Sequence, residues 1–135
     1  MASLNGTWKL IKIEKFEEFM KAIDVNEENI QKGLKLLTPE NDIKQEISVE
    51  GDKVCIKTVT PLSTQEHKGN IGQEFDQPGW DGRPVKAIFT LDGDKLVENL
   101  SGPYTASNTR YIKDGNLIME QKCGSVTSTR TYSKC

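Results

Sequence analysis

The stretch VKAIFTLDGDKLV, residues 85–97, carries the pattern that decides the fold. Every second position from Val85 to Leu91 is apolar, which is the spacing of a strand with one buried face. The residues DGD at 92–94 then interrupt the alternation before apolar residues resume. An Asp-Gly pair between two such runs is typical of a tight antiparallel hairpin. The stretch therefore predicts two neighbouring antiparallel strands.

The same period of two continues through most of the chain from residue 41 onward. Ile43, Ile47 and Val49 fall on alternate positions, and Val54 and Ile56 repeat the pattern after a turn. Turn signals separate the runs, as EGD at 50–52, KDGN at 113–116 and CGS at 123–125. Short strands joined by tight hairpins predict a mainly β fold, a meandering antiparallel sheet that closes into a barrel or a sandwich.

Helical periodicity is confined to residues 14–37. The apolar positions with helical spacing are Phe16, Phe19, Met20, Ile23, Ile30, Leu34 and Leu37. Between these two stripes, Asp24 or Asn26 is placed to cap the second helix, and Pro39 ends it. Two helices after the first strand can form a lid over a cavity in a barrel, or they can plug the end of a solid core.

The composition excludes several classes of protein. With 135 residues, we expect one domain spanning residues 1–135. A net charge of −2 with 28% charged residues predicts no nucleic-acid partner. The first residues, MASLNGTW, lack the basic and apolar regions of a signal peptide, and no stretch reaches the ~20 apolar residues of a membrane span. Cys55, Cys123 and Cys135 have no metal-like spacing, so free thiols and a cytoplasmic location are expected.

Residues that could perform catalysis are scarce. His67 is the single histidine, and the sequence has no G-x-S-x-G elbow, phosphate loop or dinucleotide fingerprint. The acidic pairs at 17–18 and 27–28 adjoin the apolar faces of the expected helices, where a solvated surface is typical. We therefore expect a protein that is not an enzyme and uses no cofactor.

The last predicted strand carries the most informative polar residues. Arg130 and Tyr132 are two positions apart, so they project from the same face of a strand, and Arg110 lies in the preceding hairpin. If all three point inward, two guanidinium groups and a phenol form a donor cluster suited to a carboxylate. An arginine on a strand more often faces water, and two buried arginines are costly without an anion, water or acidic residues nearby.

Five segments in register resemble the intracellular lipid-binding protein family, which includes the fatty acid-binding and cellular retinoid-binding proteins. The segments are NGTWKL at 5–10, FEEFMKAI at 16–23, IGQEFD at 71–76, VKAIFTLDGDKLV at 85–97 and TSTRTYSK at 127–134. The resemblance implies a ten-stranded up-and-down β-barrel with a two-helix lid after the first strand, as in lipocalin-like (calycin) folds. It also implies that Arg110, Arg130 and Tyr132 hold a ligand carboxylate inside the barrel.

The resemblance assigns further residues to the ligand site. Phe16 and Met20 are expected on the cavity side of the first helix, and Leu62 at the portal. Arg83 corresponds to a polar position near the portal, where a solvent-facing turn residue is an equal alternative. Gly69 departs from the family pattern, because a large apolar residue is common there.

The expected function is non-covalent binding and transport of one long-chain fatty acid by a monomer. Retinoic acid is the alternative ligand, since it needs the same three donors and DGRP at 81–84 resembles that branch. Transient docking to anionic membranes through Lys21, Lys32 and Lys35 is a further possibility, although lysines among glutamates are more often a solvated face.

Overall fold

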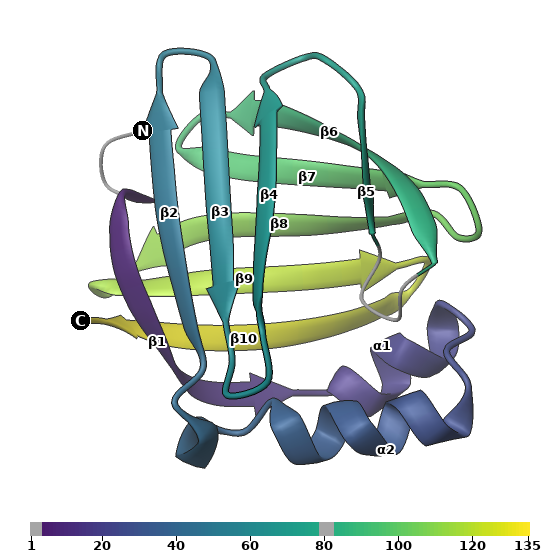
Figure 1. Ribbon diagram of the computed structural model, residues 1–135. Coiled ribbons are helices and arrows are strands. Elements are labelled where there is room, and N and C mark those ends of the chain that lie inside the picture. The colour runs from purple at the N-terminus through teal and green to yellow at the C-terminus, as the bar shows by residue number, and fades with distance from the viewer. Residues whose placement is uncertain (1–3, 79–82) are drawn as a thin grey trace.

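The computed structural model describes residues 4–78 and 83–135, and within them one ten-stranded sheet dominates the fold (Figure 1). Consecutive strands pair in an antiparallel manner, apart from β4 and β5. The strands are β1 Gly6–Glu14, β2 Lys44–Glu50, β3 Lys53–Val59, β4 Thr64–Asn70, β5 Phe75–Pro78, β6 Pro84–Asp92, β7 Lys95–Ser101, β8 Ala106–Lys113, β9 Asn116–Cys123 and β10 Val126–Lys134. The mainly β fold and the up-and-down order are confirmed.

The sheet closes on itself into a barrel rather than a sandwich. The strand β1 pairs with β2 on one side and with β10 on the other, which joins the two ends of the chain. The edges of the sheet are β4 and β5, so the barrel is nearly closed. Register in the hairpins is set by turns such as Asp114-Gly115, where φ is 54° and 81°. Two consecutive positive φ angles match the twist of antiparallel strands.

Gly69 is explained by packing at the edge strand β4. A Cβ atom at Gly69 would lie 2.5 Å from the ring of Phe75. That ring also stacks on Phe89, with ring centroids 5.3 Å apart. The aromatic ring of β5 therefore occupies the space that a large side chain on β4 would need, and it contributes apolar packing where the two edge strands are not paired.

Two helices follow β1 and lie at one end of the barrel (Figure 1). They are α1 Phe16–Ala22 and α2 Glu27–Leu36, followed by the 3₁₀ turn η2 Pro39–Asn41. Of the two expected caps, Asn26 caps α2, because its side chain accepts a hydrogen bond of 2.9 Å from the backbone N–H of Asn29. Asp24 instead adopts a left-handed conformation in the turn between the helices, with φ 63°.

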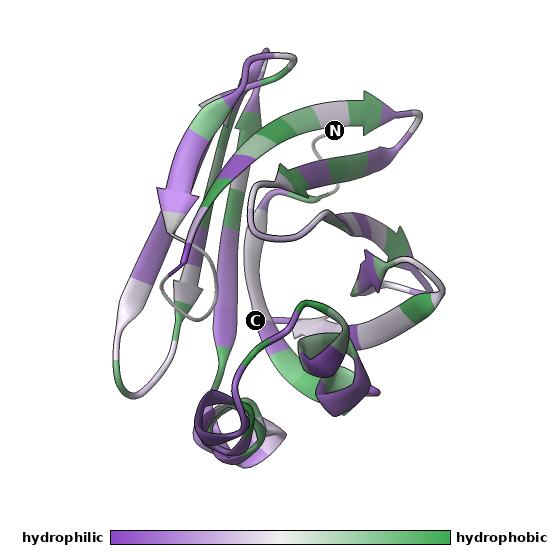
Figure 2. Cartoon of the chain, turned by 90° about the vertical axis from the view of Figure 1, so that its right-hand side faces the viewer, coloured by the Kyte–Doolittle hydropathy of each residue, from purple (hydrophilic) through white to green (hydrophobic). Residues whose placement is uncertain are grey.

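Polar and apolar residues alternate along several strands (Figure 2), and the apolar ones are mostly the buried positions. Several inward positions are nevertheless polar, and these side chains are at most 8% exposed. The buried polar residues are Gln45, Gln77, Glu98, Asn108, Arg110, Gln121, Ser128 and Arg130. Six of the eight lie on β7–β10, so buried polar side chains are concentrated on one wall of the barrel.

Candidate functional site

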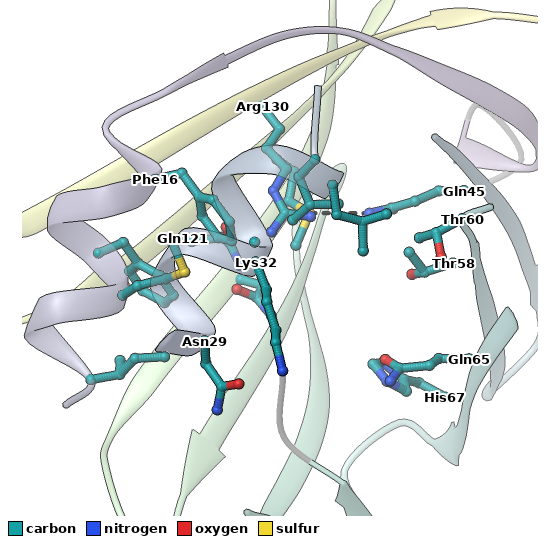
Figure 3. Close-up of a pocket in the computed structure, with 18 of the residues that line it drawn as sticks. Phe16, Asn29, Lys32, Gln45, Thr58, Thr60, Gln65, His67, Gln121 and Arg130 are labelled. Carbon is teal, nitrogen blue, oxygen red and sulfur yellow. Dashed lines mark hydrogen bonds between the residues drawn. The ribbon is translucent and has the colours of Figure 1, made fainter. Parts of the chain in front are cut away.

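A cavity of about 690 Å³ lies between the barrel wall and the helices. The helices are therefore a lid over a cavity rather than a plug in a solid core. Their contribution to the lining is largely apolar, from Phe16, Phe19, Met20, Ile23, Leu36 and Leu37. Figure 3 shows Phe16 beside Arg130 on one side of the cavity and Thr58, Gln65 and His67 on the other. The cavity thus combines an apolar lid with a polar wall.

Arg130 is buried in this cavity without an acidic partner. Its side chain is 4% exposed, and its guanidinium carbon lies 4.9 Å from the centroid of the Phe16 ring. Among the described residues, no carboxylate lies within ion-pair distance of Arg130, and its Nε–H has no hydrogen-bond acceptor. A cation stacked on a ring is partly stabilised, but the charge is not neutralised.

Tyr132 presents its hydroxyl group to the same guanidinium. The hydroxyl accepts a hydrogen bond of 3.1 Å from Gln45 Nε2 and a long one of 3.5 Å from Arg130 Nη1. Both partners are donors, so they occupy the two lone pairs and leave the hydroxyl hydrogen available to an acceptor. Tyr132 is fully buried and does not itself line the cavity, whereas Gln45 and Arg130 do.

Arg110 has a different environment, although it lies close to Arg130 in the sheet. Both residues are paired with Met119, which lies between them on β9. The Nη1 atom of Arg110 donates to Glu98 Oε1 at 3.1 Å in a pair that is almost fully buried. Its Nε–H donates to Gln45 Oε1 at 3.2 Å. The charge of Arg110 is therefore neutralised by the protein itself.

Glu98 is the centre of a dense network of donors. Besides Arg110, it accepts hydrogen bonds of 3.0 Å from Gln77 Nε2 and from Asn108 Nδ2. The Nδ1 atom of His67 lies 3.6 Å from Glu98 Oε2. Burial by itself raises the pKa of the Glu98 carboxyl group, but His67, the charge of Arg110 and the amide of Asn108 outweigh it and hold that pKa well below its usual range. Glu98 is thus a carboxylate inside the barrel.

The other residues expected at the site lie in three environments. Phe16 and Met20 are 4% and 0% exposed and line the cavity from α1, as expected. Leu62 lies in the turn between β3 and β4, where it lines the cavity mouth and is 79% exposed. Their positions agree with the expected roles, which remain predictions because no ligand contact is observed.

Arg83 connects the lid to the barrel. Its Nη2 donates to the carbonyl oxygen of Ile23 at the end of α1, at 2.7 Å, and its guanidinium lies 5.1 Å from the ring of Tyr104. Arg83 is not among the residues that line the cavity, and its expected role near the portal remains a prediction. Asp81 and Gly82, which carry the resemblance to the retinoic acid branch, lie outside the described residues.

Sequence reasoning did not identify Gln45, Glu98, Asn108 and Gln121 as site residues. A signal for Glu98 was present, because Glu98 lies between Leu96 and Leu100 on the inward face of β7. A charged residue at an apolar position of an alternating strand indicates either the edge of the core or a buried partner. Gln45 gave no comparable signal, since it lies 65 residues away from Arg110 in the chain.

Within residues 4–78 and 83–135, no group of three or more histidine, cysteine or acidic side chains is arranged to hold a metal ion. No helix in this part of the chain has the length and apolar character needed to cross a membrane. The cavity is the feature with the richest chemistry.

Comparisons with known proteins agree with this architecture. The model of the lipocalin / cytosolic fatty-acid binding protein family matches residues 5–134. Sodium/calcium exchanger regulatory protein 1 from Doryteuthis pealeii is 35% identical over 133 residues, covering 98% of this chain and 97% of that protein. Cellular retinoic acid-binding protein 2 from Mus musculus is 35% identical over 139 residues, covering 98% of each chain.

Two solved structures share the fold along nearly the whole chain. The REP1-NXSQ fatty acid transporter superposes with a TM-score of 0.90 at 32% identity, covering 100% of this chain and 98% of that one. A fatty acid-binding protein from brain tissue of Drosophila melanogaster superposes with a TM-score of 0.81 at 33% identity, covering 94% of this chain and 95% of that one.

Proposed function

The chain belongs to the lipocalin / cytosolic fatty-acid binding protein family, and we propose that it carries one long-chain fatty acid non-covalently inside the barrel. The observation that supports this proposal is Arg130, a buried cation on the wall of the cavity whose Nε–H has no acceptor among the described residues. A ligand carboxylate at this position neutralises the charge and accepts charge-assisted hydrogen bonds.

The two arginines contribute differently to this anchor. The Nε–H of Arg130 and the hydroxyl hydrogen of Tyr132 are the donors of this cluster that have no acceptor among the described residues. Arg110 is held by Glu98 and Gln45, so it orients the network and adds a weaker, largely compensated charge. A buried uncompensated charge costs several kcal/mol, so a ligand carboxylate stabilises the complex most when it lies next to Arg130.

The acyl chain supplies most of the affinity in this proposal. Burial of a methylene group contributes about 0.8 kcal/mol, so burial of about fifteen methylene groups against the apolar lid gives a gross upper bound of ~12 kcal/mol for the binding free energy. A hydrogen bond to a charged group contributes roughly 1.5–3 kcal/mol. The arginines therefore determine the orientation and head group of the ligand, and the lid residues Phe16 and Met20 contact its chain.

Retinoic acid is the second candidate ligand. A cellular retinoic acid-binding protein is among the relatives that are 35% identical to this chain. Retinoic acid is also a hydrophobic carboxylate, so it uses the same anchor at Arg130. The shape of the apolar part distinguishes the two candidates, and a competition experiment decides between them.

We also propose that the carrier acts as a monomer in the cytosol, without catalysis, and delivers its ligand at anionic membranes. The mouth of the cavity supports the last point, because Leu62 is exposed there and Lys32 and Lys35 of α2 line the opening. Two of the helix lysines already have partners, Lys21 with Glu17 at 3.3 Å and Lys32 with Glu28 at 3.4 Å. Such exposed pairs are weak enough to exchange for lipid phosphates.

The membrane step is tested by transfer of a fluorescent fatty acid from the protein to vesicles. We expect faster transfer to vesicles that contain phosphatidylserine than to neutral ones, and a smaller difference after Lys35→Gln. Equal rates with both vesicles contradict membrane docking and leave the binding proposal intact.

The binding proposal is tested by displacement of a fluorescent probe from delipidated protein with oleate, retinoic acid and retinol. We expect oleate to compete best and to lose its advantage over the neutral retinol in Arg130→Gln. Lys122→Gln, on the outer face of β9, is the charge-matched control and is expected to bind like the wild type. Preferential displacement by retinoic acid supports the second candidate. Failure of every lipid to displace the probe, or no change in Arg130→Gln, contradicts the anchor.

A further inference from the structure

A second polar row lies beside the arginine row on the same wall. Glu98 pairs with Asn108 across β7 and β8, and Asn108 pairs with Gln121 across β8 and β9. These residues are the next inward positions along the strands from Arg110 and Met119. Two residues along a strand span roughly 7 Å, so the two rows are that far apart. Both rows line the cavity.

Glu98 determines how the neighbouring amides are oriented. A carboxylate only accepts hydrogen bonds, so Gln77 and Asn108 must direct their NH₂ groups toward it, as the two 3.0 Å contacts show. Their carbonyl oxygens are consequently directed away from Glu98. Neither Gln77 Oε1 nor Asn108 Oδ1 has a hydrogen-bond partner among the described residues, and both side chains belong to residues at most 8% exposed.

Gln121 adds a third acceptor to this wall. Its Oε1 atom also has no partner in the described part of the chain, and the residue is 7% exposed. Beside Glu98, with Nδ1 at 3.6 Å from Glu98 Oε2, the ring of His67 also lines the cavity, and neither of its nitrogens has a hydrogen bond to described residues. The second row therefore presents mainly acceptors, whereas the arginine row presents donors.

An unsubstituted fatty acid and retinoic acid supply no donor to this row. A methylene chain laid across the carbonyl oxygens displaces water without replacing its hydrogen bonds, which lowers affinity. A hydroxyl group on the chain restores the missing donor, and its oxygen can accept a hydrogen bond from His67. The acceptors therefore favour a ligand with one polar group beyond its carboxylate.

We infer that the cavity prefers a fatty acid with a hydroxyl group partway along its chain, which donates to Asn108 or Gln121 while Arg130 holds the carboxylate. This inference rests on the proposed fatty acid-binding function and makes it more specific. The separation of the two rows requires that only certain hydroxyl positions fit. Hydroxyl groups next to the carboxylate or at the far end of the chain do not reach the second row.

The test compares stearate with a set of monohydroxystearates that differ only in the position of the hydroxyl group. Dissociation constants are obtained by probe displacement from the delipidated full chain. We expect the best positional isomer to bind about threefold to tenfold more tightly than stearate, the effect of one neutral hydrogen bond. If stearate binds at least as tightly as every isomer, or if all positions give the same gain, the inference is wrong.

Two variants connect the preference to the second row. Asn108→Leu is expected to abolish the preference for the best isomer, measured as the ratio of the dissociation constants of stearate and of that isomer in the same variant. Gln121→Met removes an acceptor without touching Glu98, so it provides the test if Asn108→Leu does not fold, and it is expected to reduce the preference. The matched control is Asn99→Leu on the exposed face of β7, which keeps the wild-type preference.

The remaining outcomes separate the two proposals. A preference that survives in both variants places the hydroxyl group elsewhere and overturns the assignment to this row. Displacement by stearate with no gain from any hydroxyl group overturns the inference alone. Failure of stearate and of every isomer to displace the probe overturns the fatty acid-binding function, and the inference with it.

Discussion

Arg110 and Arg130 share one wall of the barrel and one degree of burial, yet they differ in what neutralises them. Arg110 is 2% exposed and forms an ion pair with Glu98 at 3.1 Å. Arg130 is 4% exposed and lies against the ring of Phe16, with no carboxylate of the described residues nearby. A buried charge that the chain itself compensates is part of the folded structure. A buried charge that it leaves uncompensated is available to a ligand.

The largest effect is expected from breaking the compensated pair. Glu98→Leu leaves Arg110 buried without an anion, and such changes cost about 3–5 kcal/mol in the free energy of unfolding. Urea denaturation of the delipidated protein measures this loss. The double variant Glu98→Leu with Arg110→Leu is expected to recover most of it, because apolar residues can replace a buried pair at little cost. Equal stability of the single variant and the wild type contradicts a structural role for the pair.

Arg130→Met is expected to show the opposite combination of effects. Without ligand, stability stays the same or rises, because no paired carboxylate is left behind and an uncompensated charge is removed. Affinity for oleate falls by about 10- to 150-fold, which corresponds to the 1.5–3 kcal/mol of one charged hydrogen bond. Denaturation and probe displacement on the same sample measure both quantities. A large loss of stability in the unliganded variant would indicate that Arg130 is structurally paired.

Lowering the pH distinguishes the two arginines, because Arg110 is paired with a carboxylate, that of Glu98, whereas Arg130 has none among the described residues. The pKa of Glu98 is held well below its usual range in the folded protein. The unfolded chain, with an ordinary glutamate pKa of about 4.3, binds a proton first as the pH falls. Stability from Glu98 is therefore complete above about pH 4.3 and is lost below it, by at most roughly 1.4 kcal/mol per pH unit.

The acid effect is measured against Glu98→Gln, which has no titrating group at this position. We expect the difference in unfolding free energy between wild type and variant to be constant near neutral pH and to narrow below about pH 4. If the difference in unfolding free energy does not change with pH, the Glu98 carboxyl group has the same pKa in the folded and the unfolded protein. Arg130→Met serves as the control, since its difference from the wild type has no reason to follow the same acid titration.

Much of the fold could be predicted because its determinants are local. Alternating apolar residues and turns such as Asp114-Gly115 specify strands and hairpins within a few residues. The site could be predicted only in part. Arg110, Arg130 and Tyr132 are buried inside the barrel as the resemblance implied. The partner of Arg110 could not be predicted, because it depends on the register of β7 against β8.

Other parts of the site depend on contacts across the barrel. Gln45 reaches Tyr132 over 87 residues of chain, and no local pattern records that distance. Arg83 donates to the Ile23 carbonyl at the end of α1, a contact between segments that are 60 residues apart in the chain. Gly69 departs from the family pattern because the ring of Phe75 occupies the space that a side chain at position 69 would need. Each of these outcomes depends on which segments meet in three dimensions, and single-sequence patterns report only on each segment by itself.

The smallest effect is expected from Tyr132→Phe, which tests whether the phenol belongs to the anchor or only supports it. Without ligand, Gln45 Nε2 loses an acceptor at 3.1 Å and retains Met119 Sδ at 3.3 Å, a weak one. Stability is expected to fall by about 1 kcal/mol, as for one neutral hydrogen bond.

Because Tyr132 lies behind the cavity wall, oleate affinity is expected to fall by less than in Arg130→Met. A loss as large as that of Arg130→Met would mean that the hydroxyl hydrogen donates directly to the carboxylate. No loss of affinity would leave Arg130 as the sole anchor, which would make the difference between the two arginines the main determinant of how this barrel selects an acid.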